Sequence, residues 1–372
     1  MKRFIAFVTV IILLFSCGCQ AKKETPRDEK LRGVWLSYAE IPSTVGVSKS
    51  EYRRKADEIF QNIRQAGLNT AFVHIRAFSD AFYPSQIFPS SAYIAGAQGA
   101  KLAYDPTAIL IDSAKKHDIA FHAWINPFRI ATHTDTQKLS PDNPARKILD
   151  SGNAGGAVCV LENGIYYNPA CPDVHALIVD GVLEFLENHD VDGVHIDDYF
   201  YPSTDESIDC ADYDKYCKSG GEMPLSQWRR DSINAFVCAL YSAVKSSDAE
   251  LVFSISPSGN ITNNAEKLYA DVESWLADDC YADLIIPQLY YGFEHSSLPF
   301  AKTADEWASL KGENVRLAAG IAVYKSGKED VYAGEGVNEW VNNADVVRRQ
   351  IEMIQSKESY CGYVLFSYED IC

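Results

Sequence analysis

The chain has 372 residues, of which 47% are hydrophobic and 12% aromatic, which is enough for a large core and fits one barrel-sized domain better than two small domains. Its formal net charge is -17, which argues against nucleic acid or an anionic membrane surface as an electrostatic partner. The composition instead suits an exported enzyme or a protein that acts on a neutral polymer.

The first nineteen residues have the pattern of a signal peptide. Two basic residues precede an apolar run over residues 4–15, which is too short for an ordinary membrane span. The letters LFSC at residues 14–17 resemble a bacterial lipobox, in which Cys17 would be lipidated. Cys19 is the rival site, and plain secretion with two incidental cysteines is the alternative.

Three segments follow from this pattern. Residues 1–19 form the lipoprotein signal peptide, residues 20–30 form a polar, flexible tether, and residues 31–372 form the folded domain. We therefore expect a monomeric lipoprotein on the extracytoplasmic face of the cell membrane, touching the membrane only through its lipid anchor, or a secreted protein.

Eight cysteines remain after the leader, and an even count in an exported chain permits disulfides. Cys159 with Cys171, and Cys210 with Cys217, are the plausible local pairs. The chain contains no CxxC and no Cys/His cluster at zinc spacing, so the sequence predicts neither a metal nor a cofactor.

From residue 31 onward, predicted strands and helices alternate. Helical spacing and breakers place helices at 51–66, 105–117, 173–189, 226–246, 264–278, 301–310 and 343–356, with Asp105, Asp173 and Asn343 as caps. The eight predicted strands cover 32–38, 70–76, 119–125, 191–196, 250–256, 282–291, 316–324 and 362–368. A long insertion over 131–168 shows little periodicity.

This alternation predicts a (β/α)8 TIM barrel with right-handed crossovers. An open doubly wound sheet is the runner-up, weakened because no glycine-rich phosphate loop follows the first strand. The chain stops four residues after Tyr368, so the usual last helix is short or missing.

The fourth predicted strand ends in two adjacent acids, Asp197 and Asp198. It is apolar at Val194 and Ile196, and alternation along a strand puts His195 on the same side as Asp197. Acids at the C-terminal end of a parallel strand are where an α/β protein places chemistry. The alternative is a strand capped by acids that only hold the next loop.

Polar and aromatic side chains collect at the other strand ends, which predicts a cleft on the C-terminal face of the barrel. Aromatic faces with amides, acids and bases are what sugar rings need, although each residue alone is weak support. Arg76 and Asp80 could instead form a structural ion pair. The candidate substrate-binding residues are Arg76, Asp80, His122, Trp124, Asn126, Arg129, His195, Tyr199, Gln288, Tyr290 and Glu294.

The chain resembles the bacterial glycosyl hydrolase-like family 10, which includes peptidoglycan glycan-strand hydrolases anchored as lipoproteins. The most specific match is DGVHIDDYFYP over residues 192–202, supported by RGVWL at 32–36, HAWINPFR at 122–129 and IPQLY at 286–290. Such segments span about residues 31–368. The resemblance implies a (β/α)8 barrel that acts on glycans, with a polysaccharide or glycan strand as partner.

Residues 193–197 are also similar to the fourth-strand Gly-x-Arg-x-Asp of α-amylase-type barrels, in which the Asp is the nucleophile. His195 stands in place of the Arg, and the fifth-strand acid has no counterpart because residues 253–259 contain no acid. These departures weaken any inference to α-glucans and leave the general acid open.

Glycoside hydrolysis usually needs two carboxyl groups. Asp197 is the first candidate for nucleophile or base, with its pKa lowered by His195 when that ring is charged. Asp198 is the candidate acid, and the other acids considered are Asp80, Glu294, Glu40 and Glu369.

Two functions of other classes stay open at this point. One is a non-catalytic glycan-binding lipoprotein on a degenerate barrel. The other is a metal-dependent deacetylase or amidase that uses Asp197, Asp198, His195 and His122, although no compact ligand motif supports it.

Overall fold

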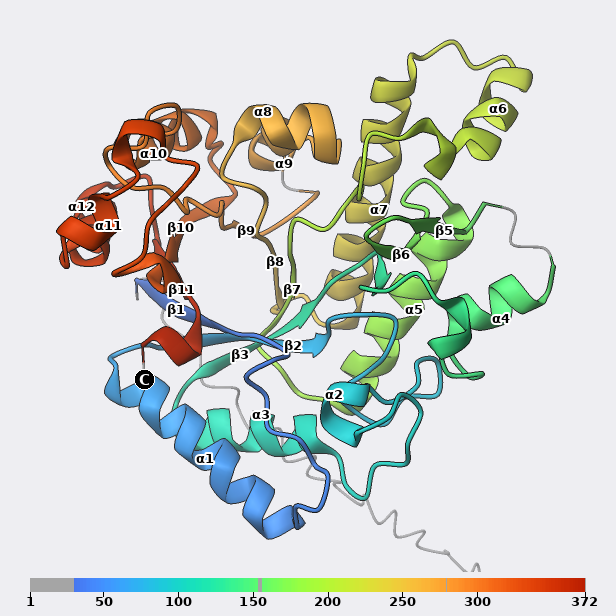
Figure 1. Cartoon of the computed structure of the whole chain (residues 1–372), viewed down its shortest axis with the longest axis horizontal. Coiled ribbons are helices and arrows are strands. Elements are labelled where there is room, and N and C mark those ends of the chain that lie inside the picture. The colour runs from blue at the N-terminus through green and yellow to red at the C-terminus, as the bar shows by residue number, and fades with distance from the viewer. Residues whose placement is uncertain (1–29, 153–155, 279, 372) are drawn as a thin grey trace, which may run out of the picture. The chain divides into compact units, whose positions relative to one another are not determined.

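The computed structural model describes residues 30–152, 156–278 and 280–371. Within them, eight parallel strands close into a barrel in the order β1-β2-β3-β7-β8-β9-β10-β11, so the predicted (β/α)8 fold is confirmed (Figure 1). The signal peptide, the tether up to residue 29, Cys17 and Cys19 lie outside the described residues. The barrel strands are β1 Leu31–Leu36, β2 Thr70–Arg76, β3 Ala120–Ile125, β7 Gly193–Ile196, β8 Val252–Ile255, β9 Leu284–Ile285, β10 Arg316–Ala322 and β11 Gly362–Phe366.

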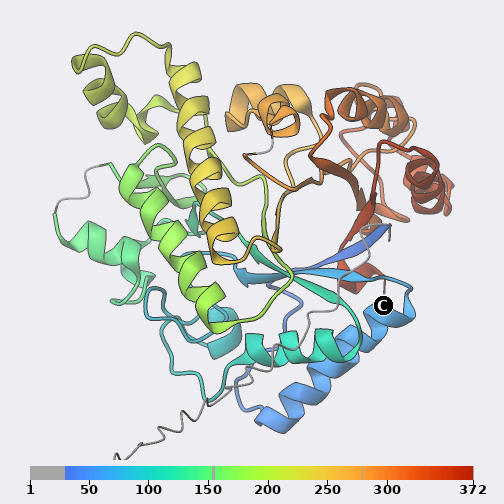
Figure 2. The same cartoon turned by 180° about the vertical axis from the view of Figure 1, so that it is seen from behind.

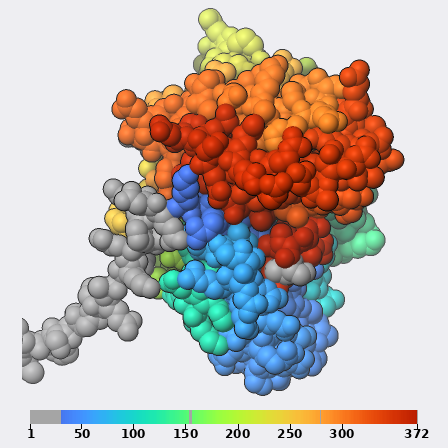
Figure 3. Space-filling model, turned by 90° about the vertical axis from the view of Figure 1, so that its left-hand side faces the viewer, coloured from blue at the N-terminus to red at the C-terminus, as the bar shows by residue number. Residues whose placement is uncertain are grey.

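The first and last barrel strands pair with each other. Residues Leu31 to Val34 of β1 lie in parallel register with Gly362 to Leu365 of β11. In the space-filling view, the blue N-terminal surface accordingly lies against the red C-terminal segments (Figure 3). After β11 the described residues form one 3-10 turn, Tyr368–Asp370.

Helices cover the outside of the barrel, and α5 Pro172–Asn188 and α7 Leu225–Ser247 run side by side on the side that faces the viewer in Figure 2. Asp105 caps α3 as predicted, accepting a hydrogen bond from the backbone N–H of Ala108 at 3.0 Å. The predicted caps at Asp173 and Asn343 are wrong, because α5 and α12 follow Cys171 and Asp345. The helices that surround the sheet are α1 Lys49–Gln65, α3 Pro106–Lys116, α5 Pro172–Asn188, α7 Leu225–Ser247, α9 Val272–Ala277, α10 Phe300–Leu310 and α12 Val346–Ser356.

Two predicted elements differ from the structure. The helix expected over 264–278 is broken into α8 Ile261–Asn263, a π turn at Asn264–Leu268 and α9, because Tyr269 takes a left-handed conformation at φ 52°. The strand expected over 282–291 has only the two residues of β9. The remaining short helices are α2 Ala92–Ala95, α4 Pro144–Asp150, α6 Cys210–Lys218 and α11 Glu339–Asn342.

The insertion between β3 and α5 forms a small antiparallel sheet that the sequence pattern did not reveal. Strands β4 Arg129–Ala131, β5 Val158–Leu161 and β6 Gly164–Tyr167 pair in the order β4-β6-β5. A side chain at Gly164 would meet the Ala131 carbonyl oxygen, so the glycine lets β6 approach β4 closely.

Neither predicted disulfide is present. Every cysteine in the described part of the chain carries a free thiol. Cys210 and Cys217 lie at opposite ends of α6, about 10 Å apart along the helix axis at ~1.5 Å per residue, which is too far for a bridge. Cys159 lies in β5 and its thiol is directed at the carbonyl oxygen of Tyr166 at 3.5 Å.

Candidate active site

The carboxylate pair follows the end of β7. Strand β7 ends at Ile196, and Asp197 and Asp198 come directly after it. Because β7 pairs with β3 and β8, the ends of these three strands surround the pair at the C-terminal face of the barrel. This is the face on which (β/α)8 enzymes carry their active sites.

Asp197 is only 3% exposed. Its Oδ2 accepts a hydrogen bond from Nε1 of Trp124 at 3.0 Å, and its Oδ1 accepts one from the backbone N–H of Tyr199 at 3.4 Å. Burial, and then repulsion by the Asp198 carboxylate, raises the pKa of Asp197 to about 7. A carboxyl group with this pKa holds a proton for much of the time at neutral pH and can donate it.

Asp198 is more accessible than Asp197. Burial raises the pKa of Asp198, while a hydrogen bond with Gln288 and the charge of Arg129 favour its ionised form. Gln288 is fixed by a second bond, from its Nε2 to the carbonyl oxygen of Ser256 at 3.0 Å. Because a proton on Asp197 removes the repulsion between the two groups, Asp198 is the member of the pair that stays ionised.

Arg129 is the cation of the site. Its guanidinium carbon lies 4.6 Å from the ring centroid of Phe78 and 4.3 Å from that of Tyr199, so two aromatic faces hold it. Its charge lowers the pKa values of Asp197 and Asp198 against the effect of burial. The exposed ring of Tyr199 is therefore held in place at the mouth of the barrel.

His195 is a core residue, contrary to the prediction that it binds substrate. It is 0% exposed, and its Nε2 lies 3.1 Å from both Trp35 Nε1 and Ser256 Oγ, while its Nδ1 lies 2.8 Å from Ser254 Oγ. Burial holds the pKa of His195 well below its usual range, so the ring is neutral. It carries no charge that could lower the pKa of Asp197, and that expectation is wrong.

His122 also lies inside the barrel and not in the cleft. It pairs in register with Gly193 at the start of β7, and a side chain at Gly193 would lie 2.7 Å from His122 Nδ1. The ring packs on Phe72 with centroids 4.7 Å apart. Burial lowers the pKa of His122 to about 3, so it too is neutral.

Trp124 holds Asp197 through a hydrogen bond, and its ring is stacked on His74. Its ring stacks on His74 at a centroid distance of 3.3 Å, and its only polar atom donates to Asp197. Burial, and then the charge of Arg129, holds the pKa of His74 well below its usual range. The stacked pair thus orients the buried carboxyl without adding a second charge.

Arg76, Asp80 and Asn126 are buried beside the site, not in its mouth. Asp80 accepts a hydrogen bond from Gln98 Nε2 at 2.9 Å, and burial raises its pKa to about 6. The Arg76 guanidinium lies over the ring of Phe88, and no ion pair joins it to Asp80 among the described residues. Asn126 accepts a hydrogen bond from the backbone N–H of Arg129 at 3.3 Å.

The other acids considered for catalysis have structural surroundings. Glu294 is exposed, and its backbone N–H donates to Glu339 at 2.8 Å. Glu40 accepts hydrogen bonds from Ser367 Oγ at 2.9 Å and from the backbone N–H of Glu369 at 2.7 Å. None of the described contacts brings these acids to the carboxylate pair.

An aromatic wall lines the β9, β10 and β11 side of the cleft. The ring centroid of Tyr290 lies 6.1 Å from that of Tyr324 and 5.8 Å from that of Phe366. Burial, and then the charge of Asp198, raises the pKa of Tyr290 well above its usual range, so it is a neutral hydrogen-bond donor. The sequence singled out Tyr290, but it did not single out Phe366 or Phe78, because aromatic residues within or just after a strand have the pattern of core residues.

Two properties of the described residues concern the metal-dependent alternative and the membrane. Within the described ranges, no three His, Cys, Asp or Glu side chains come together in an arrangement that could hold a metal ion. No helix in the same part of the chain is both long and apolar enough to cross a membrane.

Comparison with known sequences gives related proteins. The profile of the family described as "Glycosyl hydrolase-like 10" matches residues 30–334. Glycosyl hydrolase YngK of Bacillus subtilis (strain 168) is 33% identical over 387 positions, which cover 98% of this chain and 73% of the relative. Glycosyl hydrolase DigH of Escherichia coli (strain K12) is 28% identical over 375 positions, which cover 91% of this chain and 83% of that protein.

Solved structures share the fold. The PgaB (BpsB) glycoside hydrolase domain from Bordetella bronchiseptica superposes with a TM-score of 0.64 at 14% identity, covering 92% of this chain and 95% of that domain. The catalytic domain of β-amylase from Paenibacillus polymyxa gives a TM-score of 0.55 at 11% identity, covering 92% and 93%. At these identities the similarity establishes the barrel architecture and nothing finer.

Proposed function

Because the chain belongs to the glycosyl hydrolase-like 10 family, we propose that it hydrolyses O-glycosidic bonds in the cleft around Asp197 and Asp198. The observation that carries the proposal is the unequal environment of these two adjacent carboxyls. Asp197 is buried with a pKa of about 7, whereas Asp198 is more accessible and is hydrogen-bonded to Gln288. Hydrolysis of a glycoside needs one protonated and one ionised carboxyl group, and this pair supplies both at neutral pH.

The environments favour roles opposite to those expected from the sequence alone. With a pKa of about 7, Asp197 carries a proton at neutral pH, so it is the general acid that protonates the leaving oxygen. Asp198 is the nucleophile, or the base that activates water. Trp124 keeps the Asp197 carboxyl in one orientation through its 3.0 Å hydrogen bond.

We propose a cell-envelope or extracellular glycan as substrate, with peptidoglycan strands as the first candidate. The support is the resemblance on residues 192–202, the acidic composition, and the exposed or partly exposed aromatic rings of Tyr199 and Tyr290 at the mouth. Aromatic faces stack on the C–H faces of pyranose rings, while the guanidinium of Arg129 offers donors to hydroxyl and amide oxygens.

The test of this activity uses purified protein and purified envelope. Peptidoglycan, with and without its peptides removed, is incubated with the wild type and with Asp197→Asn, and the products are identified by mass spectrometry. The proposal expects new reducing ends with the wild type alone. Glycan binding without cleavage by the wild type would instead favour the non-catalytic binding protein.

We also propose that the protein is anchored outside the cytoplasm through a lipidated Cys17 or Cys19. The LFSC segment and the polar stretch that follows it support this. A fatty-acid probe should label the wild type in growing cells and should not label a variant with Ser at both positions. An unlabelled wild type that is freely secreted would contradict the anchor.

A further inference from the structure

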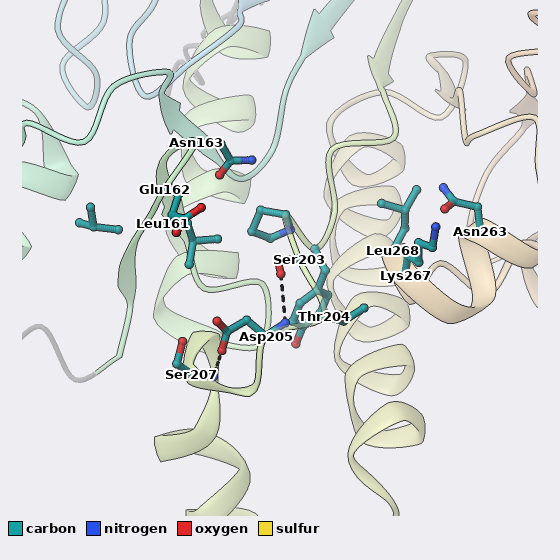
Figure 4. Close-up of a pocket in the computed structure, with 13 residues that line it drawn as sticks. Leu161, Glu162, Asn163, Ser203, Thr204, Asp205, Ser207, Asn263, Lys267 and Leu268 are labelled. Carbon is teal, nitrogen blue, oxygen red and sulfur yellow. Dashed lines mark hydrogen bonds between the residues drawn. The ribbon is translucent and has the colours of Figure 1, made fainter. Parts of the chain in front are cut away.

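A groove with a volume of about 780 Å³ begins three residues after the carboxylate pair along the chain (Figure 4). Its size falls within the ~300–1,000 Å³ typical of small-molecule sites. We propose that this groove is a second sugar-binding subsite, which holds more distant units of the glycan that is cut at Asp197 and Asp198. The inference rests on the proposed function and adds to it a preference for long chains.

Three parts of the chain that are distant in sequence build the groove. The turn between β5 and β6 supplies one wall, the segment after β7 supplies the floor, and α8 with the π turn supplies the opposite wall. In Figure 4, Asn163 and Glu162 lie across the floor from Asn263 and Lys267. The lining residues are Val160, Leu161, Glu162, Asn163, Tyr201, Pro202, Ser203, Thr204, Asp205, Ser207, Asn263, Lys267 and Leu268.

A buried ion pair fixes the floor. Arg229 and Asp209 are fully buried and joined at 2.7 Å, and Arg229 also donates to the backbone carbonyl oxygens of Thr204 at 3.1 Å and Asp205 at 2.9 Å. Tyr201 donates to the same aspartate at 2.8 Å. A buried ion pair adds little net stability, so its value here is that it holds one backbone conformation between the catalytic acids and the groove.

The side chains left free in the groove suit a neutral sugar. Within the floor, Ser203 and Asp205 bond to backbone N–H groups of their own turn, as the dashed lines in Figure 4 show. Among the described contacts, the side chains of Asn163, Asn263 and Lys267 have no hydrogen-bond partner within the protein. They can therefore bond to a ligand without breaking an existing interaction.

The charges and the apolar surfaces narrow the choice of ligand. Glu162 and Asp205 carry negative charge and Lys267 carries the one positive charge of the lining, so the groove repels a strongly anionic ligand such as a phosphate. Leu161, Pro202 and Leu268 provide apolar surface between the polar groups. Apolar patches bordered by amides match the two faces of a pyranose ring and its hydroxyl and acetamido groups.

Occupation of a remote subsite has a kinetic consequence. Binding energy from units far from the scissile bond can be used to orient the substrate at the reacting centre, so shorter substrates lose kcat as well as affinity. We therefore expect affinity and kcat/KM to rise with chain length until the groove is filled. A protein with a disabled groove should lose this rise and keep its activity on the shortest substrate.

The experiment compares N-acetylglucosamine oligomers of two and six units. Their binding is measured by titration calorimetry in an Asp197→Asn background, with and without Asn163→Ala and Asn263→Ala together. The matched control is Arg53→Ala, an exposed residue on the outer face of α1. Loss of two hydrogen bonds should weaken the six-unit ligand about tenfold or more and leave the two-unit ligand unchanged.

Two results would overturn the subsite. The first is that the six-unit oligomer binds the groove variant as tightly as it binds the Asp197→Asn parent. The second is that the parent binds the two-unit and six-unit oligomers equally, which includes binding neither. Failure of the proposed hydrolysis is seen separately, as intact six-unit oligomer after incubation with the wild type while the length-dependent binding persists.

Discussion

His195 within β7 and Asp197 directly after its end lie two residues apart, yet their environments are opposite. His195 lies inside the barrel with partners at both ring nitrogens and stays neutral. Asp197 lies at the strand tip with two N–H donors and a neighbouring carboxylate, and its pKa is raised to about 7. A polar residue with satisfied hydrogen bonds stabilises the fold, whereas one whose ionised form is held at a cost is available for chemistry.

The largest loss of activity should come from substitution of the two acids that follow β7. Asp197→Asn and Asp198→Asn should each lower kcat/KM on a natural glycan by at least about a hundredfold, since acid–base catalysis alone contributes ~10²–10⁴. The melting temperature should not fall in either variant. Asp112→Asn, an exposed acid on α3, is the matched control and should retain full activity.

Substitution of His195, which lies deeper in the barrel, should lower stability and leave most of the activity. His195→Ala leaves a cavity and removes the partner of Trp35 Nε1, so the free energy of unfolding should fall by about 3 kcal/mol, measured in urea. Well below its melting temperature, the variant should keep kcat/KM within about tenfold of the wild type. A hundredfold loss in protein that is still folded would show that His195 takes part in catalysis.

The raised pKa of Asp197 predicts how stability changes with pH. A carboxyl whose pKa is higher in the folded state than in the unfolded state stabilises the fold only when protonated, so its contribution is lost as pH rises from about 4 through 7. Asp197→Asn should therefore be more stable than the wild type at pH 8, on the order of 4 kcal/mol, with little difference at pH 4. Parallel stability curves for the two proteins would contradict the assigned pKa.

A smaller effect is expected at Arg129. Its positive charge lowers the pKa values of Asp197 and Asp198, so Arg129→Met should raise both. The whole profile of kcat/KM against pH should shift to higher pH by less than about one pH unit. A shift to lower pH would mean that Arg129 acts on the pair through another group.

The sequence was sufficient for the barrel and for the position of the acids. Alternating strands and helices determine the topology, and a period of two along β7 places His195 and Asp197 on one side. The depth of each side chain of β7 within the barrel could not be predicted, because it depends on which residues of β3 and β8 lie in register with β7. The sequence pattern therefore predicts His122 and His195 in the cleft, although the barrel encloses them.

Other features depend on contacts between distant segments. The burial of Asp80 depends on Gln98, and the position of Glu40 depends on Ser367, which follows β11. The small β4-β6-β5 sheet has strands of three or four residues, which are too short for periodicity to reveal. The hydrogen bond from Gln288 and the charge of Arg129, which favour the ionised form of Asp198, likewise come from distant parts of the chain.

The division of roles between the two acids is tested most directly with aryl glycosides of a sugar that the wild type releases. The leaving groups should differ widely in acidity, because a good leaving group needs no proton from the enzyme. If Asp197 is the acid, Asp197→Asn should recover most of its lost kcat/KM on the activated substrate, and Asp198→Asn should remain at least about a hundredfold impaired on both. Recovery by Asp198→Asn instead, or by neither variant, would contradict the assignment of Asp197 as the proton donor.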